Sequence, residues 1–520
     1  MLVIGLDAAD PGLLERLAAD GRAPTVARLQ REGTTADLES PLRTLPGAIW
    51  PELATGVSGG RSALYYHPRQ LRTGEAVARR IETCDVDAEA QYWVVATAGG
   101  RRSLTVDVPQ SVATPAEVGG TQLFEWGLHD RSFSTASQPP ELLERIRSRH
   151  GDHPVAVCDS AHGSTVPGYR RLLRGLRDGI DAKGEFASEL VERNDWDLAT
   201  VVFAEGHCAG HQLFHFHDPT HRSHDAAAPA DLREGITDVY RRLDAAVARL
   251  IDAAGHDAEV LVVASHGMAS YVGGYQLLAP VLEALGYGRQ HPRPTKPPKS
   301  ALPLRRLVRR ALPTAVRDRR DSARRADPAT YTRVVFTDPS QRAAVLDNNR
   351  CGAVRLNVEG REPQGTIAPD DVASTLDELR AQLAALVDPA TGQPIVEATQ
   401  TAREAFGPDH HPDLPDLLVD FRTDLGPLEA CTSPATGQIN RTFRSAHTPR
   451  TGDHVPGSRL WATGRGFAPG AVIDGANVLD VAPTVLDLLA VPVPASVDGR
   501  SLRLDAITTG IAANDAASAT

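Results

Sequence analysis

Histidines concentrate in one short stretch of this chain. The stretch is FAEGHCAGHQLFHFHDPTH, in which His207 and His211 are four residues apart. One helical turn brings residues i and i+4 to the same face, so this spacing predicts two neighbouring imidazoles, a common pair of metal ligands. Glu205, two residues upstream of His207, adds a carboxylate. The alternative is a polar helix start at which histidines accumulate without a function.

Further candidate ligands lie at the ends of segments that look like strands. Asp7 closes VIGLD, and Ser265 and His266 follow EVLVVA. Asp453 and His454 lie in the glycine-containing sequence RTGDHVPG. Imidazoles and carboxylates together suit zinc or a similar divalent ion. Taken one at a time, these residues are equally typical of a helix N-cap, a buried histidine with satisfied hydrogen bonds, or a solvated loop.

The elements that would position these residues are short apolar runs that alternate with helical patterns. The runs that look like buried parallel strands are Leu2–Leu6, Leu104–Val108, Ala199–Phe203, Glu259–Ala264 and Leu417–Phe421. Apolar residues recur at helical spacing over Asp10–Ala18, Glu185–Arg193, Leu232–Ala254 and Asp370–Leu386. This alternation predicts an α/β fold with a central, mostly parallel sheet sandwiched by helices. Ligands of such sheets bind beyond the carboxyl ends of the strands, where most of the candidate residues lie.

Composition restricts the class of protein. The 520 residues are 41% hydrophobic and carry a net charge of −11, which excludes disorder throughout the chain and argues against general nucleic-acid binding. Five scattered cysteines without a CxxC pair argue against a disulfide scaffold and a thiolate zinc site. The N-terminus is typical of a first strand, and no apolar run approaches the ~20 residues of a membrane span. We therefore expect a soluble, cytoplasmic protein; the sequence leaves the oligomeric state open.

One segment has the opposite charge. From Arg289 to Asp327 there are 13 basic and 3 acidic residues, a net charge of +10, which leaves −21 on the rest of the chain. We expect an Arg- and Pro-rich insertion or cap at residues 286–345, between two parts of one core, 1–285 and 346–505, with a flexible tail at 506–520. The arginines either attract an anionic substrate or lipid surface, or form a solvated helical hairpin that pairs with the acidic core.

Several motifs are shared with one enzyme family. They are the opening VIGLDAADPGLLERLAADGRAPTVARLQREG, the segments IWPELATG, VDVP, RLNVEGREPQG and GDHVPG, and the closing DVAPTVLDLLAVPVPASVDGRSL. With these motifs, the chain from Leu2 to about Leu502 resembles the alkaline phosphatase superfamily, in particular its type I phosphodiesterase/nucleotide pyrophosphatase family. The resemblance implies the fold of that superfamily and two divalent metals, commonly zinc, around a Ser or Thr nucleophile.

The first metal of that family binds an Asp, a His four residues later and a late His. His211 and His454 match the two histidines, and His207 stands at the position of the Asp. Histidine still suits zinc, so the resemblance implies one metal site at His207, His211 and His454. Glu205 is a candidate to restore the lost carboxylate.

The second metal of that family binds the first-strand Asp, the nucleophile and an adjacent Asp-His pair. Asp7 and His266 match, but Ser265 replaces the Asp of the pair, and a serine hydroxyl is a poor ligand. The nucleophile position falls on Pro46, and Thr44 is the nearest hydroxyl. Thr44 is therefore the candidate nucleophile, with a helix-capping threonine as the alternative. The second site, at Asp7, Ser265 and His266, lacks a full set of ligands.

The resemblance implies metal-dependent hydrolysis of a small-molecule phosphate ester, by a phosphodiesterase or a phosphatase. Bound metal would polarise the phosphoryl oxygens and lower the pKa of Thr44 or of a water molecule. Asn357 and Arg361, in RLNVEGREP, are candidate substrate-binding residues, because arginine binds phosphate with two parallel hydrogen bonds. A structural turn that pairs Arg361 with Glu362 is the alternative.

Three other functions are consistent with the same core. Sulfate-ester hydrolysis is one, although no Cys-x-Pro-Ser-Arg sequence of the sulfatase type is present. A phosphomutase is another. The missing acid at Ser265 and the absence of a clear nucleophile also allow a catalytically degenerate member that binds a phosphorylated ligand without turning it over.

Overall fold

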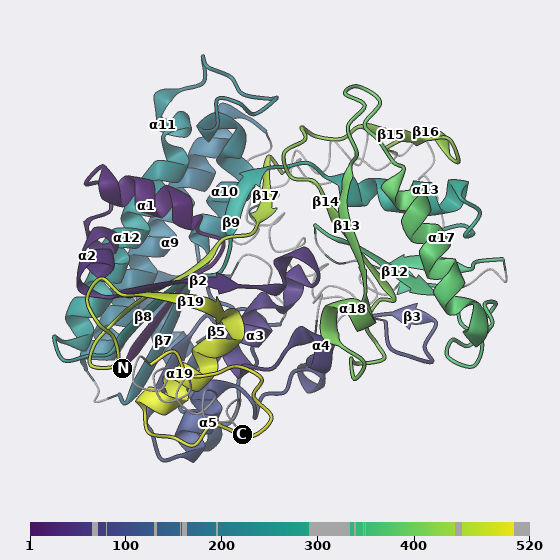
Figure 1. Ribbon diagram of the computed structural model, residues 1–520. Coiled ribbons are helices and arrows are strands. Elements are labelled where there is room, and N and C mark those ends of the chain that lie inside the picture. The colour runs from purple at the N-terminus through teal and green to yellow at the C-terminus, as the bar shows by residue number, and fades with distance from the viewer. Residues whose placement is uncertain are drawn as a thin grey trace, which may run out of the picture. The chain divides into compact units, whose positions relative to one another are not determined.

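A computed structural model gives the fold of the chain (Figure 1). It describes residues 1–64, 71–79, 81–128, 133–155, 158, 164–193, 196–290, 333–336, 340–346, 348, 350–441 and 450–503. The chain divides into two compact units. The first comprises Met1–Tyr65, Glu82–Val272 and Ser445–Thr520, and the second comprises Tyr66–Ile81 and Gly273–Arg444.

A nine-stranded sheet forms the centre of the first unit. In spatial order its strands are β19 (Val472–Asn477), β2 (Thr34–Glu39), β18 (Ser458–Thr463), β8 (Val260–Ala264), β1 (Leu2–Leu6), β7 (Leu198–Phe203), β4 (Ser103–Val106), β5 (Thr121–Phe124) and β6 (Ala136–Gln138). β1 is parallel to its neighbours β7 and β8, and β4 is parallel to β7 and β5. β18 is antiparallel to β8 and β2. The sheet is therefore mixed but parallel at its centre, which confirms the predicted α/β class.

Alternate residues of the central strands enter two hydrophobic cores, one on each face of this sheet. Leu2, Ile4 and Leu6 of β1 belong to the first core, and Val3 belongs to the second. The first core is completed by α1 (Pro11–Ala19), α2 (Pro24–Glu32), α7 (Pro140–His150), α9 (Val166–Glu192), α10 (Glu205–His217), α11 (Ala230–Arg233) and α12 (Gly235–Ala254). The second is completed by α3 (Ile49–Thr55), α5 (Tyr92–Ala98) and α19 (Val481–Leu488). Helices thus cover both faces of the sheet, as predicted (Figure 1).

Short elements complete the first unit. They are α4 (Gly59–Ser62), α6 (Ala116–Gly119), the paired strands β9 (Gly267–Ser270) and β17 (Gly452–Val455), and the 3-10 turns η1 (Pro41–Arg43), η2 (Pro46–Ala48), η3 (Thr83–Asp85) and η7 (Val478–Asp480). β1, β7 and β8 are buried along their whole length, which explains why their sequences are continuous apolar runs.

The second unit is built on a four-stranded antiparallel sheet. Its order is β11 (Ala343–Leu346), β12 (Gly352–Leu356), β14 (Leu417–Phe421) and β13 (Val396–Thr401). It also contains the strand pairs β3 (Val77–Ala78) with β10 (Arg333–Val334) and β15 (Ala430–Ser433) with β16 (Gly437–Asn440), and the helices η4 (Gly274–Leu277), α13 (Leu278–Ala284), η6 (Pro369–Asp371), α17 (Val372–Ala384) and α18 (Ala402–Phe406).

One strand prediction is wrong in its direction. The run Leu417–Phe421 was expected in the parallel sheet, but β14 pairs antiparallel with β12 and β13 in the second unit. All five of its residues are buried. A continuous apolar run indicates that a strand is buried, but it does not indicate the partner or the direction.

The basic segment predicted as an insertion lies mostly outside the described residues. Of residues 286–345, the structure describes 286–290, 333–336 and 340–345, so Arg289 is the one described member of the basic set. The predicted tail at 506–520 also lies outside the described residues. The cap and the domain boundaries therefore stay predictions. Among the helices of the described residues, none combines the length and the hydropathy of a membrane span.

Candidate metal centre

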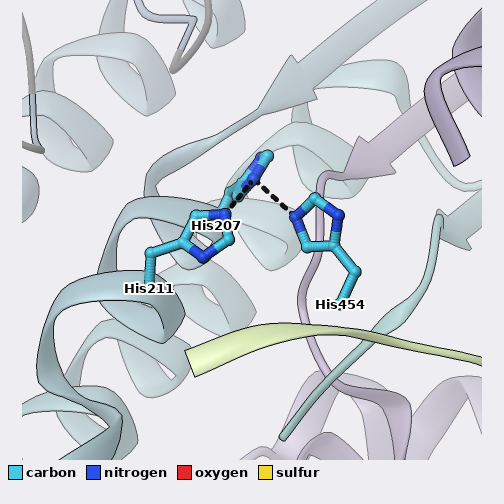
Figure 2. Close-up of side chains that lie close together, drawn as sticks. All are labelled: His207, His211 and His454. Carbon is cyan, nitrogen blue, oxygen red and sulfur yellow. Dashed lines mark hydrogen bonds between the residues drawn. The ribbon is translucent and has the colours of Figure 1, made fainter. Parts of the chain in front are cut away.

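Three imidazoles converge beyond the carboxyl ends of the central strands. His207 and His211 lie one turn apart on α10, which follows β7, and His454 lies on β17. Nε2 of His207 is 2.9 Å from Nε2 of His211 and 2.8 Å from Nε2 of His454. Figure 2 shows the three rings turned toward one another, with His207 between the other two. All three side chains are buried, and their ligand atoms lie within 4.8 Å of one another.

A glycine lets β17 approach α10 closely enough to form this cluster. A Cβ atom on Gly452 would lie 2.3 Å from the carbonyl oxygen of Gly210 on α10, which is far inside van der Waals contact. The neighbouring backbone is bonded to the same helix, because the amide of Thr451 donates to the carbonyl of His211 at 2.7 Å. The position of His454 beside α10 therefore depends on the absence of a side chain at Gly452.

Hydrogen bonds determine which nitrogens of two rings carry protons. Nδ1 of His207 is 2.6 Å from Oδ2 of Asp7, and Nδ1 of His211 is 2.7 Å from the carbonyl oxygen of Gly452. Burial opposes the ionisation of Asp7, but the charge and hydrogen bond of His207 outweigh it and hold the pKa of Asp7 below its usual range. A carboxylate and a carbonyl only accept hydrogen bonds, so each Nδ1 carries a hydrogen, and in the neutral form of each ring Nε2 is the nitrogen with the lone pair.

In the neutral form of both rings, the Nε2 lone pairs of His207 and His211 would face each other across 2.9 Å, and a cation bound between them would remove their repulsion. Burial, together with repulsion by Arg450 and by the neighbouring histidines in their protonated form, lowers the pKa of His454 well below its usual value, so this ring is neutral. Neutral imidazoles are the form in which histidine binds metals. The residues present therefore fit a divalent transition metal held by three histidines, the donor set of an open zinc site.

Asp7 is fully engaged with protein groups. Its Oδ1 accepts from Nε1 of Trp50 at 2.7 Å and from Oγ of Ser265 at 3.3 Å, while Oδ2 accepts from His207. A carboxylate that holds the second nitrogen of a ligand histidine fixes the ring and increases its basicity. Asp7 therefore orients His207, at the edge of the metal site.

Comparison with known proteins identifies the family. The family model of type I phosphodiesterase / nucleotide pyrophosphatase matches residues 1–430 of the chain. The chain belongs to this family, in the alkaline phosphatase superfamily. This confirms the resemblance seen in the sequence. A search of curated protein sequences gives no significant match.

The chain is also similar to solved structures of other proteins. Murine ectonucleotide pyrophosphatase / phosphodiesterase 5 is 11% identical with a TM-score of 0.49, covering 95% of this chain and 96% of its own. Phosphonoacetate hydrolase from Sinorhizobium meliloti 1021, in complex with phosphonoformate, is 12% identical with a TM-score of 0.44, covering 94% and 95%. An inactive form of the murine protein, in complex with AMP, has a TM-score of 0.47 and 11% identity.

The residues of the second site predicted from the family lie beside the first. The ring of His266 is tilted by 46° against that of His454, with centroids 4.2 Å apart, and its centroid is 6.0 Å from that of His207. Oγ of Ser265 accepts from the amide of Ala8 at 3.0 Å and donates to Asp7. Among the described residues, the three histidines are the one group of three or more histidine, cysteine or acidic side chains that converges in this way.

Glu205 is not brought to the three imidazoles. Its Oε1 is 3.2 Å from Nε2 of His153 and 3.6 Å from Nζ of Lys183, and that amine is 2.9 Å from Asp107. All four side chains are buried. Burial opposes the charge of Lys183, yet the two carboxylates raise its pKa. Sequence reasoning missed this second polar cluster, although Asp107, like Asp7, follows a buried strand.

Thr44, the candidate nucleophile, makes a hydrogen bond to a nearby backbone carbonyl. Oγ1 of Thr44 donates to the carbonyl of Pro41 at 3.2 Å. The helix-capping alternative is wrong, because the N-cap of α3 is Ala48, without a side-chain hydrogen bond. The chain enters that helix through η2, whose residues are Pro46, Gly47 and Ala48. None of these three has a hydroxyl.

The candidate substrate-binding residues are engaged within the second unit. Nδ2 of Asn357 donates to the carbonyls of Gln341 and Gln364 at 2.9 and 2.8 Å. Arg361 makes two bonds to Asp416, at 2.6 and 2.7 Å, and one to Glu362 at 2.9 Å. The structure therefore contains the ion pairs of the structural alternative, and binding of substrate by these residues stays a prediction.

Two further residues at the metal site were missed in the sequence. Trp50 lies on α3 and holds Asp7, and Nη1 of Arg450 is 3.2 Å from Nε2 of His211. Arg450 begins the sequence RTGDH that carries His454, so its place in that motif is the signal that could have indicated it. Trp50 lies in IWPELATG, another segment shared with the family, and that is the comparable signal.

Proposed function

We propose that this chain is a metal-dependent hydrolase of small-molecule phosphate esters, a phosphodiesterase or a phosphatase. The observation that carries the proposal is the convergence of Nε2 of His207, His211 and His454, with the opposite nitrogens of two rings already bonded to acceptors. Membership of a family of phosphoester hydrolases supports the reaction class.

The three histidines would hold one divalent ion, and zinc is the best match to three imidazole ligands. When bound, such an ion polarises a phosphoryl oxygen and lowers the pKa of water. The chain's own groups hold the ligands in place. Asp7 keeps the hydrogen on Nδ1 of His207, and the carbonyl of Gly452 keeps the hydrogen on Nδ1 of His211.

We propose water as the attacking group. The residues that enter α3 are Pro46, Gly47 and Ala48, so no side chain there offers an oxygen. Thr44 is the nearest alternative, and its hydroxyl donates to a backbone carbonyl. We also propose that the protein works in a reducing compartment, the cytoplasm, and the absence of a disulfide among the described residues supports this.

The proposal is tested on purified protein whose metal content has first been measured. A phosphomonoester, a phosphodiester and a sulfate ester are offered to the same sample, with AMP among the monoesters. We expect phosphate-ester hydrolysis that a chelator removes and zinc restores, and that His454→Ala abolishes. His256→Ala, at an exposed histidine, is the matched control. Turnover that survives the chelator and His454→Ala would exclude this function.

A catalytically degenerate member is the second candidate. The observation that favours it is the combination of Pro46 at the nucleophile position with Ser265 in place of an acid. Such a protein would bind zinc and a phosphorylated ligand but turn over none of the esters in the panel. Preferential turnover of the sulfate ester would instead indicate a sulfatase.

A further inference from the structure

We infer that Arg450 binds the phosphoryl group of the ligand, and that it selects a terminal phosphoryl group, with three free oxygens, over a diester. This inference rests on the proposed function and names the substrate class of the same site. It starts from one contact: Nη1 of Arg450 lies 3.2 Å from Nε2 of His211, the atom that would bind the metal.

The backbone beside Arg450 is fixed to the helix that carries two of the metal ligands. The amide and the hydroxyl of Thr451 both donate to the carbonyl of His211, at 2.7 and 3.2 Å. Nδ1 of His215 is 3.1 Å from the Thr451 hydroxyl, and Nε2 of His221 is 3.1 Å from the Thr451 carbonyl. These contacts hold the backbone next to Arg450 against α10, which keeps this arginine close to the metal ligands.

The contact with His211 and the binding of a metal exclude each other. Nε2 of His211 has one lone pair, because its Nδ1 carries the hydrogen bonded to Gly452. That lone pair either accepts from Arg450 or binds the ion. If the three histidines held a metal, this N–H of Arg450 would no longer donate to His211 and could donate to a ligand of the metal.

Charge favours an anion there. Counting only the groups that contact the three imidazoles, a divalent ion and the Asp7 carboxylate leave a net charge of +1, and Arg450 raises it to +2. A phosphoryl dianion matches this charge, whereas a diester carries only one negative charge.

The number of non-bridging phosphoryl oxygens also favours a terminal phosphoryl group over a diester. A guanidinium binds a phosphoryl group most strongly with two parallel N–H donors, which occupy two oxygens. A metal held by the three histidines would bind a third. A monoester or a terminal phosphate has three non-bridging oxygens, but a diester has two. A diester must therefore give up one of these contacts.

Calorimetric titration of the zinc-loaded full-length protein at pH 8 tests the inference. The ligands are phenylphosphonate, with three free oxygens, and its monomethyl ester, with two. Arg450→Ala should weaken phenylphosphonate about 10- to 100-fold and the monomethyl ester less than about threefold. Arg450→Lys keeps the positive charge but loses the two parallel N–H donors, so it should recover part of the affinity for phenylphosphonate. Arg31→Ala, at an exposed arginine of α2, is the control.

The outcomes separate this inference from the proposed function. Equal loss for both ligands, no loss for either, or loss of zinc from Arg450→Ala would overturn the role of Arg450. If the wild-type protein binds phenylphosphonate through Arg450 but hydrolyses no ester, the hydrolase proposal fails while this inference stands. If the wild-type protein hydrolyses esters and Arg450→Ala binds both ligands as the wild type does, the hydrolase proposal stands while this inference fails. Thermal unfolding of each variant checks that it is folded.

Discussion

Asp7 and His207 are joined by a hydrogen bond of 2.6 Å between Oδ2 and Nδ1, although 200 residues separate them in the sequence. The bond connects the end of the first strand to the helix after β7. It keeps the hydrogen on Nδ1 and leaves Nε2 to face His211 and His454. A carboxylate at the strand end thus determines which nitrogen of His207 is available to a metal.

The first prediction concerns this carboxylate. Asp7→Asn removes the charge that fixes the His207 ring, so we expect zinc affinity to fall about 10- to 100-fold without loss of the fold. Competition with a chromophoric chelator measures the affinity. Asp37→Asn, at an exposed aspartate of β2 that pairs with Arg459, should bind zinc as the wild type does. Unchanged zinc affinity in Asp7→Asn would show that His207 does not depend on Asp7.

The second prediction concerns the close approach of β17 to α10. A methyl group at Gly452 would lie 2.3 Å from the carbonyl oxygen of Gly210, so Gly452→Ala must displace His454. We expect loss of bound zinc, together with a lower melting temperature. Gly426→Ala is the matched control, because nothing lies within 4 Å of its added carbon. Wild-type zinc binding by Gly452→Ala would mean that β17 can shift without moving the ligand.

The third prediction concerns a buried acid on α3. Burial raises the pKa of Glu52 to about 8, well above the ~4.3 of a free glutamate. Between these values the folded state binds the proton more tightly than the unfolded state, so the free energy of unfolding falls as pH rises from ~4.3 to 8. Glu52→Gln keeps an oxygen for the amide of Gly59, which the Glu52 carboxyl accepts at 2.7 Å, and it removes the titration.

Urea unfolding of the wild type and of Glu52→Gln at pH 5 and pH 8 checks the direction in which stability changes with pH. We expect similar stability near pH 5, and at pH 8 a variant more stable than the wild type by on the order of 3 kcal/mol. Parallel stability curves across this range would show that Glu52 ionises in the folded protein as it does in the unfolded chain.

The fourth prediction concerns the attacking group. If water attacks, Thr44→Ala should keep kcat within a few-fold of the wild-type value and leave the zinc content unchanged. Steady-state kinetics on the best ester of the panel measures this. A loss of a thousandfold or more at unchanged zinc content would instead assign a covalent role to Thr44.

Local patterns in the sequence predicted the central part of the site. The i, i+4 spacing placed His207 and His211 on one helix face, and buried apolar runs placed Asp7 and α10 at the same edge of a parallel sheet. His454 could be linked to them only through the family resemblance, since nothing local connects residues 454 and 207. The contact of His454 with His207 depends on the pairing of β17 with β9.

Other features had no local signal. Glu205 was expected near the metal because it lies two residues from His207, but in a helix such residues point in different directions, and Glu205 contacts Lys183 and His153 instead. The contact of Trp50 with Asp7 joins two elements through a side chain that is ordinarily a core residue. Tertiary contacts of this kind do not follow from spacing along the chain.

X-ray absorption at the zinc edge, with the zinc content of the same sample, tests most directly that one metal is held by three histidines. We predict one zinc per chain, with three imidazole nitrogens at ~2.0–2.1 Å and one further light-atom ligand, and no bound zinc in His454→Ala. A protein that holds no zinc, two zinc ions per chain, or a shell with fewer than three imidazoles would contradict this site.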